Sequence, residues 1–373
     1  MARHWAINGR FLAQPLTGVQ RYAREIVGAI DRLLVSHPAV ADHLDIELLV
    51  PPDAIVDIEL AAMRARVVGY LRGHAWEQLM LPMHVKGGLL SLCNTGPVVA
   101  AQHIVCIHDT NTRNFPQSYA PSFRALYRVL LPVLGRKAEC VSTVSHHSAR
   151  ELVRHGICAP GKIFVAPNGH EHAAGWRARH SLKTQMAAGE GTIVLVGSSA
   201  PHKNAGLIVG MADRLHTVGL RVAIAGMSDA RVFNLPDAEQ APNLSWLGRL
   251  TDAELAALLR DSMCLAFPSF AEGFGLPPLE AMALGCPVIV SDRASLPEIC
   301  GDAALYASPD DADAWFDRFM ELYRSSERRR DMIARGRQRT SLFRWDTSAE
   351  LYLLAMLEAG GLQQEAAMDV IMQ

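Results

Sequence analysis

Two glutamates and a glycine-containing loop form the segment of the sequence with the clearest chemical pattern. Glu272 and Glu280 bound the run Glu272-Gly273-Phe274-Gly275-Leu276-Pro277-Pro278-Leu279-Glu280. The apolar residues before it predict a buried strand, and a proline near position 277 is typical of the start of a helix. A glycine loop that leads into a helix can bind an anion, because free backbone N–H groups and the positive end of the helix dipole point the same way.

A diphosphate that carries a sugar fits this pattern. Glu272 lies in the loop and can hydrogen-bond sugar hydroxyls, whereas Glu280, expected in the first turn of the helix, can reach a ribose. Taken alone, a glutamate at a helix start is often only a partner of the helix dipole, and two isolated glutamates are usually solvated. The combination of strand, glycine loop, proline and both acids favours the functional interpretation.

A second candidate segment is Val196–Asn204, which follows a predicted strand and opens a predicted helix. Lys203 could neutralise a phosphate there, although a lysine at a helix start is as often simply solvated. With the glutamate segment as context, Lys203 is the best candidate to stabilise a leaving diphosphate, by electrostatic preorganisation.

In the first half of the chain, His108 follows the apolar strand candidate Ile104–Ile107. The carboxyl ends of parallel strands are where ligands bind in open α/β sheets. Asp109 could orient the imidazole. Asn94 and Thr95 follow another predicted strand, so we expect them on the same side. We interpret Asn94, Thr95 and Asp109 as acceptor-binding residues.

Gly18 stands at the start of a predicted helix, Gly18–Leu34, directly after Thr17. Thr17 can be a simple N-cap, and we leave that interpretation open beside a functional one.

Residues 110–138 contain five basic residues and no acid. Apolar residues recur there at helical spacing, with Arg124 and Arg128 on an adjacent face. Such a helix can lie on an anionic membrane surface, or it can face a core and leave its arginines solvated. Both interpretations remain open.

These candidates need a scaffold, and the sequence predicts one of the α/β class. Short apolar runs alternate with helical patterns, which is typical of parallel sheets covered by helices. The alternation stops in the polar stretch 167–190 and restarts at Thr192. We therefore expect an N-terminal acceptor-binding Rossmann-like domain (1–170), a linker (171–190), a C-terminal nucleotide-sugar-binding Rossmann-like domain (191–345) and a C-terminal helix (346–373) packing back on the first domain. The two domains are expected to face a cleft.

Composition excludes several classes of protein. The 373 residues carry a net charge near −2, with 50% hydrophobic and 20% charged residues, which argues against a protein built mainly to bind nucleic acid. The seven cysteines form no C-x-x-C pair and several lie in apolar runs, as expected of buried free thiols in a reducing compartment. No signal segment, zinc cluster or metal-binding D-x-D motif is evident, so we expect a metal-independent, cofactor-free protein in the cytoplasm, either free or at the inner face of the cell membrane.

The sequence resembles the retaining family 4 glycosyltransferases, which have the two-domain GT-B fold. Their E-x7-E signature is matched by Glu272 and Glu280. The blocks SWLGRLTDAELAALLRDS, FPSFAEGFGLPPLEAMALGCPVIVSD and SLPEICGDAALYASPDD are also similar to consecutive blocks of that family. The resemblance covers nearly the whole chain and is most specific in the C-terminal half.

The resemblance implies roles for the candidate residues. Glu272, Lys203 and His108 would act on the transferred sugar and the diphosphate. Glu280 would hold the ribose. Ser198 stands where many members have an arginine, and His202 also replaces a frequent arginine, so phosphate binding would depend more on Lys203. The donor-binding set would be Gly18, Ser198, His202, Gly273, Phe274, Gly275, Leu276 and Glu280.

The C-terminal blocks look most like mannosyltransferases of bacterial polysaccharide assembly. We therefore expect transfer of mannose from GDP-mannose to a glycan or lipid-linked acceptor, with retention of configuration. A UDP-hexose donor is the alternative within the class. A nucleotide-sugar epimerase, a phosphorylase and a non-catalytic sugar-nucleotide-binding protein are the alternatives outside it.

Overall fold

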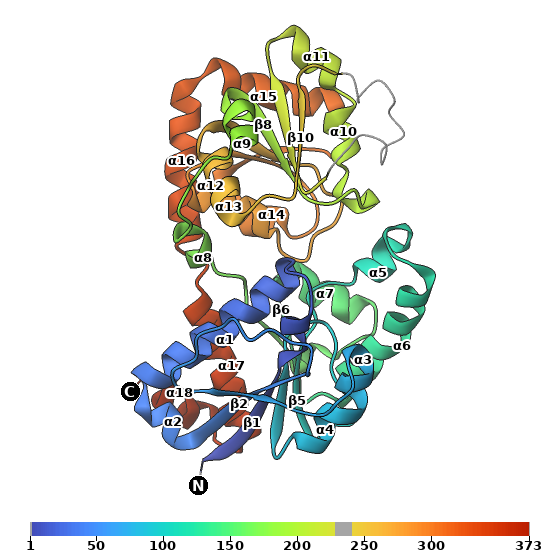
Figure 1. Ribbon diagram of the computed structural model, residues 1–373, viewed down its shortest axis with the longest axis vertical. Coiled ribbons are helices and arrows are strands. Elements are labelled where there is room, and N and C mark those ends of the chain that lie inside the picture. The colour runs from blue at the N-terminus through green and yellow to red at the C-terminus, as the bar shows by residue number, and fades with distance from the viewer. Residues whose placement is uncertain (1, 228–240, 373) are drawn as a thin grey trace. The chain divides into compact units, whose positions relative to one another are not determined.

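The computed structural model describes residues 2–227 and 241–372, which form two compact units, each around one parallel β-sheet (Figure 1). Unit 1 comprises Met1–Arg113, Pro121–Gly169 and Arg344–Gln373. Unit 2 comprises Asn114–Ala120 and His170–Phe343. The expected α/β class with two Rossmann-like sheets is therefore confirmed.

The sheet of unit 1 has seven strands among the described residues, in the order β3-β2-β1-β4-β5-β6-β7. All neighbouring strands are parallel. The central strands β4 and β5 are almost completely buried, as expected when helices cover both faces of a parallel sheet. The strands are β1 (Arg3–Asn8), β2 (Leu44–Val50), β3 (Arg64–Val67), β4 (Gly88–Ser91), β5 (Gln102–Cys106), β6 (Cys140–Thr143) and β7 (Ile163–Val165).

Helix α1 shows why the helices of unit 1 form where they do. Tyr22, Ile26 and Ile30 recur at spacings of four and are fully buried, so one face of the helix lies in the core. Burial of each such side chain contributes roughly 1.5–3 kcal/mol. The helices of unit 1 are α1 (Gly18–Ser36), α2 (Pro38–His43), α3 (Gly73–Ala75), the π-helix η2 (Trp76–Met80), α4 (Leu81–His84), α5 (Asn111–Asn114), α6 (Pro121–Lys137), α7 (His146–Arg154), α17 (Trp345–Ala359) and α18 (Gln364–Met372).

The end of the chain is part of unit 1. Helix α17 packs against α1, and the hydroxyl of Tyr352 lies 2.8 Å from that of Tyr22 and 2.6 Å from that of Ser142. All three residues are buried. This hydrogen-bonded group joins the last long helix to α1 and to strand β6.

The sheet of unit 2 has six parallel strands within the described residues, in the order β10-β9-β8-β11-β12-β13. They are β8 (Gly189–Val196), β9 (Arg221–Ala225), β10 (Leu244–Gly248), β11 (Ser262–Phe267), β12 (Val288–Ser291) and β13 (Ala304–Ala307). The helices are α8 (Glu171–Ala174), α9 (Leu182–Ala187), α10 (Ala205–Val209), α11 (Ala212–Thr217), α12 (Asp252–Arg260), α13 (Leu276–Ala283), α14 (Leu296–Cys300), α15 (Ala312–Arg324) and α16 (Ser326–Thr340).

The structure differs from the sequence expectations at several elements. The polar stretch expected to be irregular contains the short helices α8 and α9, and α9 packs against α12. Strand β3 carries two arginines in four residues instead of a continuous apolar run. Strand β13 and helices α14 and α16 were not predicted. Helix α16 has a mean hydropathy too low to show a clear apolar stripe.

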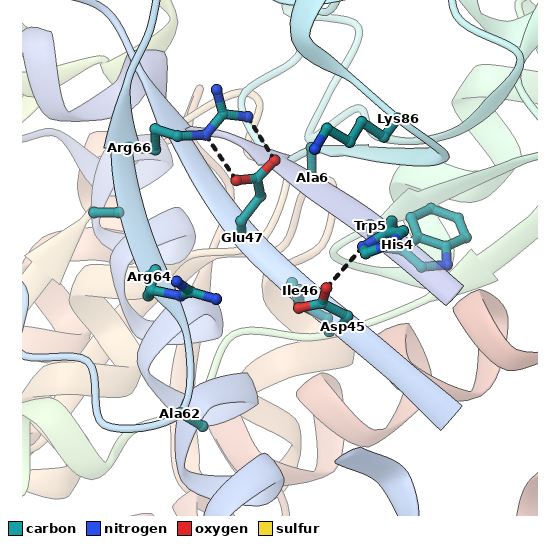
Figure 2. Close-up of a pocket in the computed structure, with 11 residues that line it drawn as sticks. His4, Trp5, Ala6, Asp45, Ile46, Glu47, Ala62, Arg64, Arg66 and Lys86 are labelled. Atoms are coloured by element: carbon teal, nitrogen blue, oxygen red, sulfur yellow. Dashed lines mark hydrogen bonds and ion pairs between the residues drawn. The ribbon is translucent and has the colours of Figure 1, made fainter. Parts of the chain in front are cut away.

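A groove in unit 1 is lined by residues of strands β1, β2 and β3, mostly from their amino-terminal parts (Figure 2). The connection 51–63 between β2 and β3 forms no helix, so charged side chains line a groove of about 510 Å³ there. Glu47 and Arg66 form a bidentate ion pair of 2.8 and 2.9 Å, and His4 lies 2.7 Å from Asp45. These ion pairs lie away from the carboxyl ends of the strands, where ligands of such sheets bind.

No helix within the described ranges 2–227 and 241–372 combines the length and apolar character needed to cross a bilayer.

Candidate functional site

The loop between strand β11 and helix α13 forms the centre of the candidate site in unit 2. Gly275 ends this loop with a φ of 106°, a backbone conformation that side chains with a Cβ rarely adopt. The buried hydroxyl of Ser295 donates to the carbonyl oxygens of Glu272 (3.1 Å) and Phe274 (2.7 Å). Ser295 therefore holds the backbone of this loop in place, a role that the sequence analysis did not predict.

Helix α13 begins at Leu276, followed by Pro277 and Pro278. Because proline has no N–H, Leu276 alone supplies an amide hydrogen among the first three helical residues. An anion at this helix start would therefore meet the amides of the loop residues Phe274 and Gly275 together with that of Leu276.

Glu280 is the fifth residue of α13 and lies in its second turn. The expectation that it lies in the first turn was wrong, because the helix begins one residue earlier than expected, at Leu276 rather than at Pro277. The interpretation of Glu280 as a mere partner of the helix dipole loses weight, since that effect fades beyond the first turn.

Lys203 and Glu272 form an ion pair at the carboxyl side of the sheet. The Nζ of Lys203 lies 2.8 and 2.9 Å from the two carboxylate oxygens of Glu272. The Glu272 side chain is 10% exposed, that of Lys203 25%. The ammonium also lies 5.5 Å from the centre of the Phe267 ring. Since an ammonium has three N–H donors, Lys203 can hold Glu272 and still donate to a phosphate oxygen.

Asn204 joins the two loops that carry this ion pair. It adopts a left-handed conformation with φ of 53°, which asparagine tolerates better than most residues. Its amide donates to the carbonyl oxygens of Pro268 (3.2 Å) and Pro309 (2.8 Å). No local pattern predicts these contacts, because they join Asn204 to residues 64 and 105 positions away.

Ser198 and His202 occupy different environments. Ser198 is exposed in the loop after β8. His202 is buried, its Nδ1 lies 2.9 Å from the hydroxyl of Ser118, and its ring stacks on Tyr119 at 6.1 Å. His202 therefore contacts residues 114–120 of unit 2, and its donor-binding role stays a prediction.

Glu280 has a partner that the sequence analysis missed. The Nε2 of His172 lies 3.0 Å from Oε1 of Glu280. His172 belongs to α8, in the stretch expected to be an irregular connection. A lone histidine in a polar stretch carries no positional signal, so only the folded structure shows this pair.

In unit 1, His108 is buried two residues after the end of β5. Its Nε2 lies 2.8 Å from the carbonyl oxygen of Leu92, and its backbone N–H donates to Oδ1 of Asn94 at 2.7 Å. Tyr22 contacts the imidazole edge-on at 4.8 Å. The Leu92 carbonyl, rather than Asp109, thus holds the ring. Asp109 instead accepts the Asn111 N–H at 2.8 Å.

Thr95 is completely buried in a charged network. Its hydroxyl lies 2.7 Å from the Arg10 guanidinium and 3.0 Å from the Glu77 carboxylate, which Arg10 contacts at 2.9 Å. Burial by itself raises the pKa of Glu77, but hydrogen bonds from His74 and Asn8 and the charge of Arg10 lower it below its usual range. The Thr95 side chain is occupied within this network, whereas Asn94 is only half-buried.

Gly18 is the exposed first residue of α1. Thr17 does not cap the helix with its side chain; its hydroxyl is hydrogen-bonded to the Gln20 side chain instead. Thr17 is thus the N-cap residue of α1, with its backbone carbonyl accepting the Arg21 N–H at 2.9 Å, but its side chain does not cap the helix. The donor-binding interpretation of Gly18 stays a prediction.

Comparison with known proteins agrees with the chemistry of this site. A sequence model of the family described as "Glycosyl transferases group 1" matches residues 177–339, within unit 2. The O-antigen chain mannosyltransferase B of Escherichia coli is 32% identical over 258 residues, 65% of this chain and 67% of that relative. The chain belongs to the group 1 glycosyltransferases.

This glycosyltransferase is also 26% identical to the O-antigen chain mannosyltransferase RfbU of Salmonella typhimurium over 324 aligned residues. The aligned region covers 83% of this chain and 88% of the relative. Its fold is similar to that of the sucrose-phosphate synthase of Thermosynechococcus elongatus, with a TM-score of 0.71 and 19% sequence identity. The superposition covers 96% of this chain and 100% of the synthase chain. The GT-B fold expected for this glycosyltransferase is confirmed.

Proposed function

We propose that this glycosyltransferase moves mannose from GDP-mannose, with retention and without a metal ion, to a glycan or lipid-linked acceptor in polysaccharide synthesis. The observation that carries the proposal is the Lys203–Glu272 ion pair beside the glycine loop. Two relatives named as O-antigen chain mannosyltransferases support the choice of mannose.

Different site residues would contact different parts of the donor. The loop amides of Phe274, Gly275 and Leu276, together with Lys203, would stabilise the diphosphate as charge develops on it. Glu272 would accept hydrogen bonds from the hydroxyls of the transferred sugar, and Glu280 from those of the ribose. A site that combines an ammonium and amide donors with carboxylates suits a sugar diphosphate better than a phosphate or a sugar alone.

In the proposed reaction, the bond between the sugar C1 and the β-phosphate oxygen breaks, and its electron pair leaves with GDP. The acceptor hydroxyl oxygen forms a new bond to C1 on the same face. Its proton passes to a phosphate oxygen of the departing GDP. Lys203 and the loop amides carry the negative charge that this step creates.

A panel of sugar nucleotides tests the proposal. Binding and transfer are measured with GDP-mannose, UDP-glucose, UDP-galactose and UDP-N-acetylglucosamine, in the presence of EDTA, and the anomeric configuration of the product is read by NMR. We expect transfer of α-mannose from GDP-mannose alone. Transfer from a UDP-hexose would move the assignment to that donor class. Binding without hydrolysis or transfer would identify a sugar-nucleotide-binding protein, and isomerised donor would identify an epimerase.

We further propose that helix α6 of unit 1 contacts an anionic membrane, which would bring the enzyme to a lipid-linked acceptor. Its first half is exposed, including the apolar side chains of Phe123, Leu126 and Val129. Arg124 and Arg128 are exposed on the same stretch. Exposed apolar residues next to cationic ones are the features with which a helix lies on an anionic bilayer.

Cosedimentation with vesicles tests this contact. Vesicles that contain about a third anionic lipid should retain the protein, and neutral vesicles should retain much less, since charge adds about 1 kcal/mol per basic residue. Replacing Phe123 and Leu126 by serine should abolish the retention while leaving transfer to a water-soluble acceptor intact. Equal retention of this variant would overturn the role of α6.

A further inference from the structure

The pair formed by His172 and Glu280 is the most buried histidine–carboxylate contact near the candidate donor site. The two side chains are 4% and 8% exposed, and Nε2 of His172 lies 3.0 Å from Oε1 of Glu280. No role for His172 follows from the E-x7-E signature, which contains the glutamates only.

The surroundings of His172 hold its ring in a fixed position. Helix α8 packs against α13, and the ring of Trp176 contacts the imidazole edge-on, with centres 5.5 Å apart. The residue before α8, His170, is held by the carbonyl oxygen of Phe343, 2.8 Å from its Nδ1. The Phe343 ring in turn contacts Phe274 of the donor loop edge-on at 5.7 Å. His172 is thus a rigid partner rather than a mobile surface side chain.

A buried carboxylate is costly unless it accepts hydrogen bonds, and a glutamate has three rotatable bonds that burial must fix. His172 addresses both needs, because its N–H binds one oxygen of Glu280 and sets the direction of the other. A carboxylate can accept about four hydrogen bonds, so the contact with His172 does not by itself use up the acceptor capacity of Glu280.

We infer that His172 is a positioning residue that holds the Glu280 carboxylate in the orientation that binds the ribose of the donor nucleotide. This inference rests on the proposed ribose contact of Glu280. The transferred sugar and the diphosphate depend on a different ion pair, that of Lys203 with Glu272, and the two pairs share no residue. The effect of His172 should therefore be confined to the nucleoside part of the donor.

Binding of two nucleotides to the wild type and to a His172 variant tests whether the effect of His172 is confined to the nucleoside. Calorimetry measures the Kd of GDP and of 2′,3′-dideoxy-GDP for the wild type and for His172→Ala, and UDP with its dideoxy analogue is run in parallel. We expect His172→Ala to weaken binding of GDP about tenfold, a change that corresponds to about 1.4 kcal/mol. Binding of the dideoxy nucleotide should change less than about twofold, because it lacks the hydroxyls through which His172 acts.

Two further variants complete the experiment. His172→Gln keeps an N–H donor and should recover most of the affinity for GDP, which separates the positioning role from a loss of fold. His180→Ala is the matched control, since His180 also pairs with a carboxylate in unit 2, at 2.8 Å from Asp261, and should leave both nucleotides unaffected.

The outcomes separate the inference from the proposed function. Equal weakening of both nucleotides by His172→Ala, or no weakening of either, would overturn the role of His172 while nucleotide binding itself stands. If the wild type binds UDP but not GDP, only the proposed donor nucleotide is wrong. The measurements with UDP and its dideoxy analogue then test the positioning role of His172. A wild type that binds neither would overturn the proposed function and this inference with it.

Discussion

The Nζ of Lys203 lies 2.8 and 2.9 Å from the two carboxylate oxygens of Glu272, and this contact joins the loops after strands β8 and β11. Each residue is therefore the electrostatic partner of the other before any donor is bound. Removing one leaves the other with an unbalanced charge in a largely buried position, so the two side chains act as one unit.

A double-mutant cycle should show this dependence. Lys203→Met and Glu272→Gln are each expected to lower kcat/KM for the sugar nucleotide at least about 100-fold, because each removes a charge needed at the reacting centre. The double variant should lose far less than the product of the two factors, since the second change disturbs a pair already broken. Steady-state kinetics on the four proteins measures the coupling.

Lys183→Met provides the control for that cycle. Lys183 lies in the same unit, but its ammonium contacts the backbone carbonyl oxygens of Leu247 and Arg249 rather than a carboxylate. It should keep wild-type kinetics. Fully multiplicative losses in the Lys203 and Glu272 variants would show that the ion pair has no part in transfer.

Ser295→Ala should loosen the donor loop. The variant removes the two hydrogen bonds to the carbonyl oxygens of Glu272 and Phe274 and leaves both buried without this donor. We expect a loss of about 1–3 kcal/mol in the free energy of unfolding and a higher KM for the donor. Thermal unfolding and kinetics check both effects. The control is Ser341→Ala, whose hydroxyl bonds the Gln338 carbonyl on the surface, and unchanged donor KM in Ser295→Ala would refute the loop's dependence on it.

Gly275→Ala should damage the same loop by a different cause. A Cβ at Gly275 would lie 2.7 Å from Cδ2 of Leu296, and the φ of 106° is unfavourable for alanine. Gly248 also has a positive φ, of 62°, but a Cβ there would meet nothing within 4 Å. Gly248→Ala therefore measures the cost of a left-handed conformation without a steric contact, about 1–2 kcal/mol, and Gly275→Ala should exceed it because its φ lies farther from that region and its Cβ meets Leu296. Chemical unfolding of the two variants measures the difference; equal losses would contradict a steric contribution from Leu296.

The elements that position the site follow closely from the sequence because their signals are local. The apolar run before Glu272, the prolines at the start of α13 and the strand before Lys203 all depend on neighbouring residues, and the structure has each of them close to its expected place. The start of α13 was missed by one residue, which moved Glu280 into the second turn.

The contacts that orient the site residues could not be predicted, because they join residues far apart in the chain. His172 meets Glu280 across 108 positions, and Asn204 meets Pro309 across 105. Thr95 lies after a strand, as predicted, but its hydroxyl is hydrogen-bonded to Arg10 and Glu77 and is not available to an acceptor. A residue's position after a strand predicts the edge of the sheet at which it lies. Its contacts with other elements determine whether its side chain can face a ligand.

The buried network of unit 1 makes the protein sensitive to acid at His103. The hydroxyl of Ser91 accepts the Asn8 amide N–H and is also hydrogen-bonded to Nε2 of His103, at 3.0 Å. Burial lowers the pKa of His103 from 6.5 to about 4, and the negative charge of Glu77 offsets only part of this effect. The folded protein thus resists a proton that the unfolded chain takes up.

The stability contributed by neutral His103 should be complete above pH 6.5 and disappear as the pH falls to about 4, because the pKa is depressed in the folded state. The difference corresponds to about 3 kcal/mol. His103→Gln keeps a hydrogen-bonding group but cannot titrate, so its free energy of unfolding should fall less steeply over this range. Urea unfolding at several pH values compares it with the wild type and with His43→Gln, a variant of an exposed histidine. Parallel pH profiles for wild type and His103→Gln would mean that the buried imidazole does not set this sensitivity, whereas converging profiles toward pH 4 would locate it in the Asn8–Ser91–His103 contact.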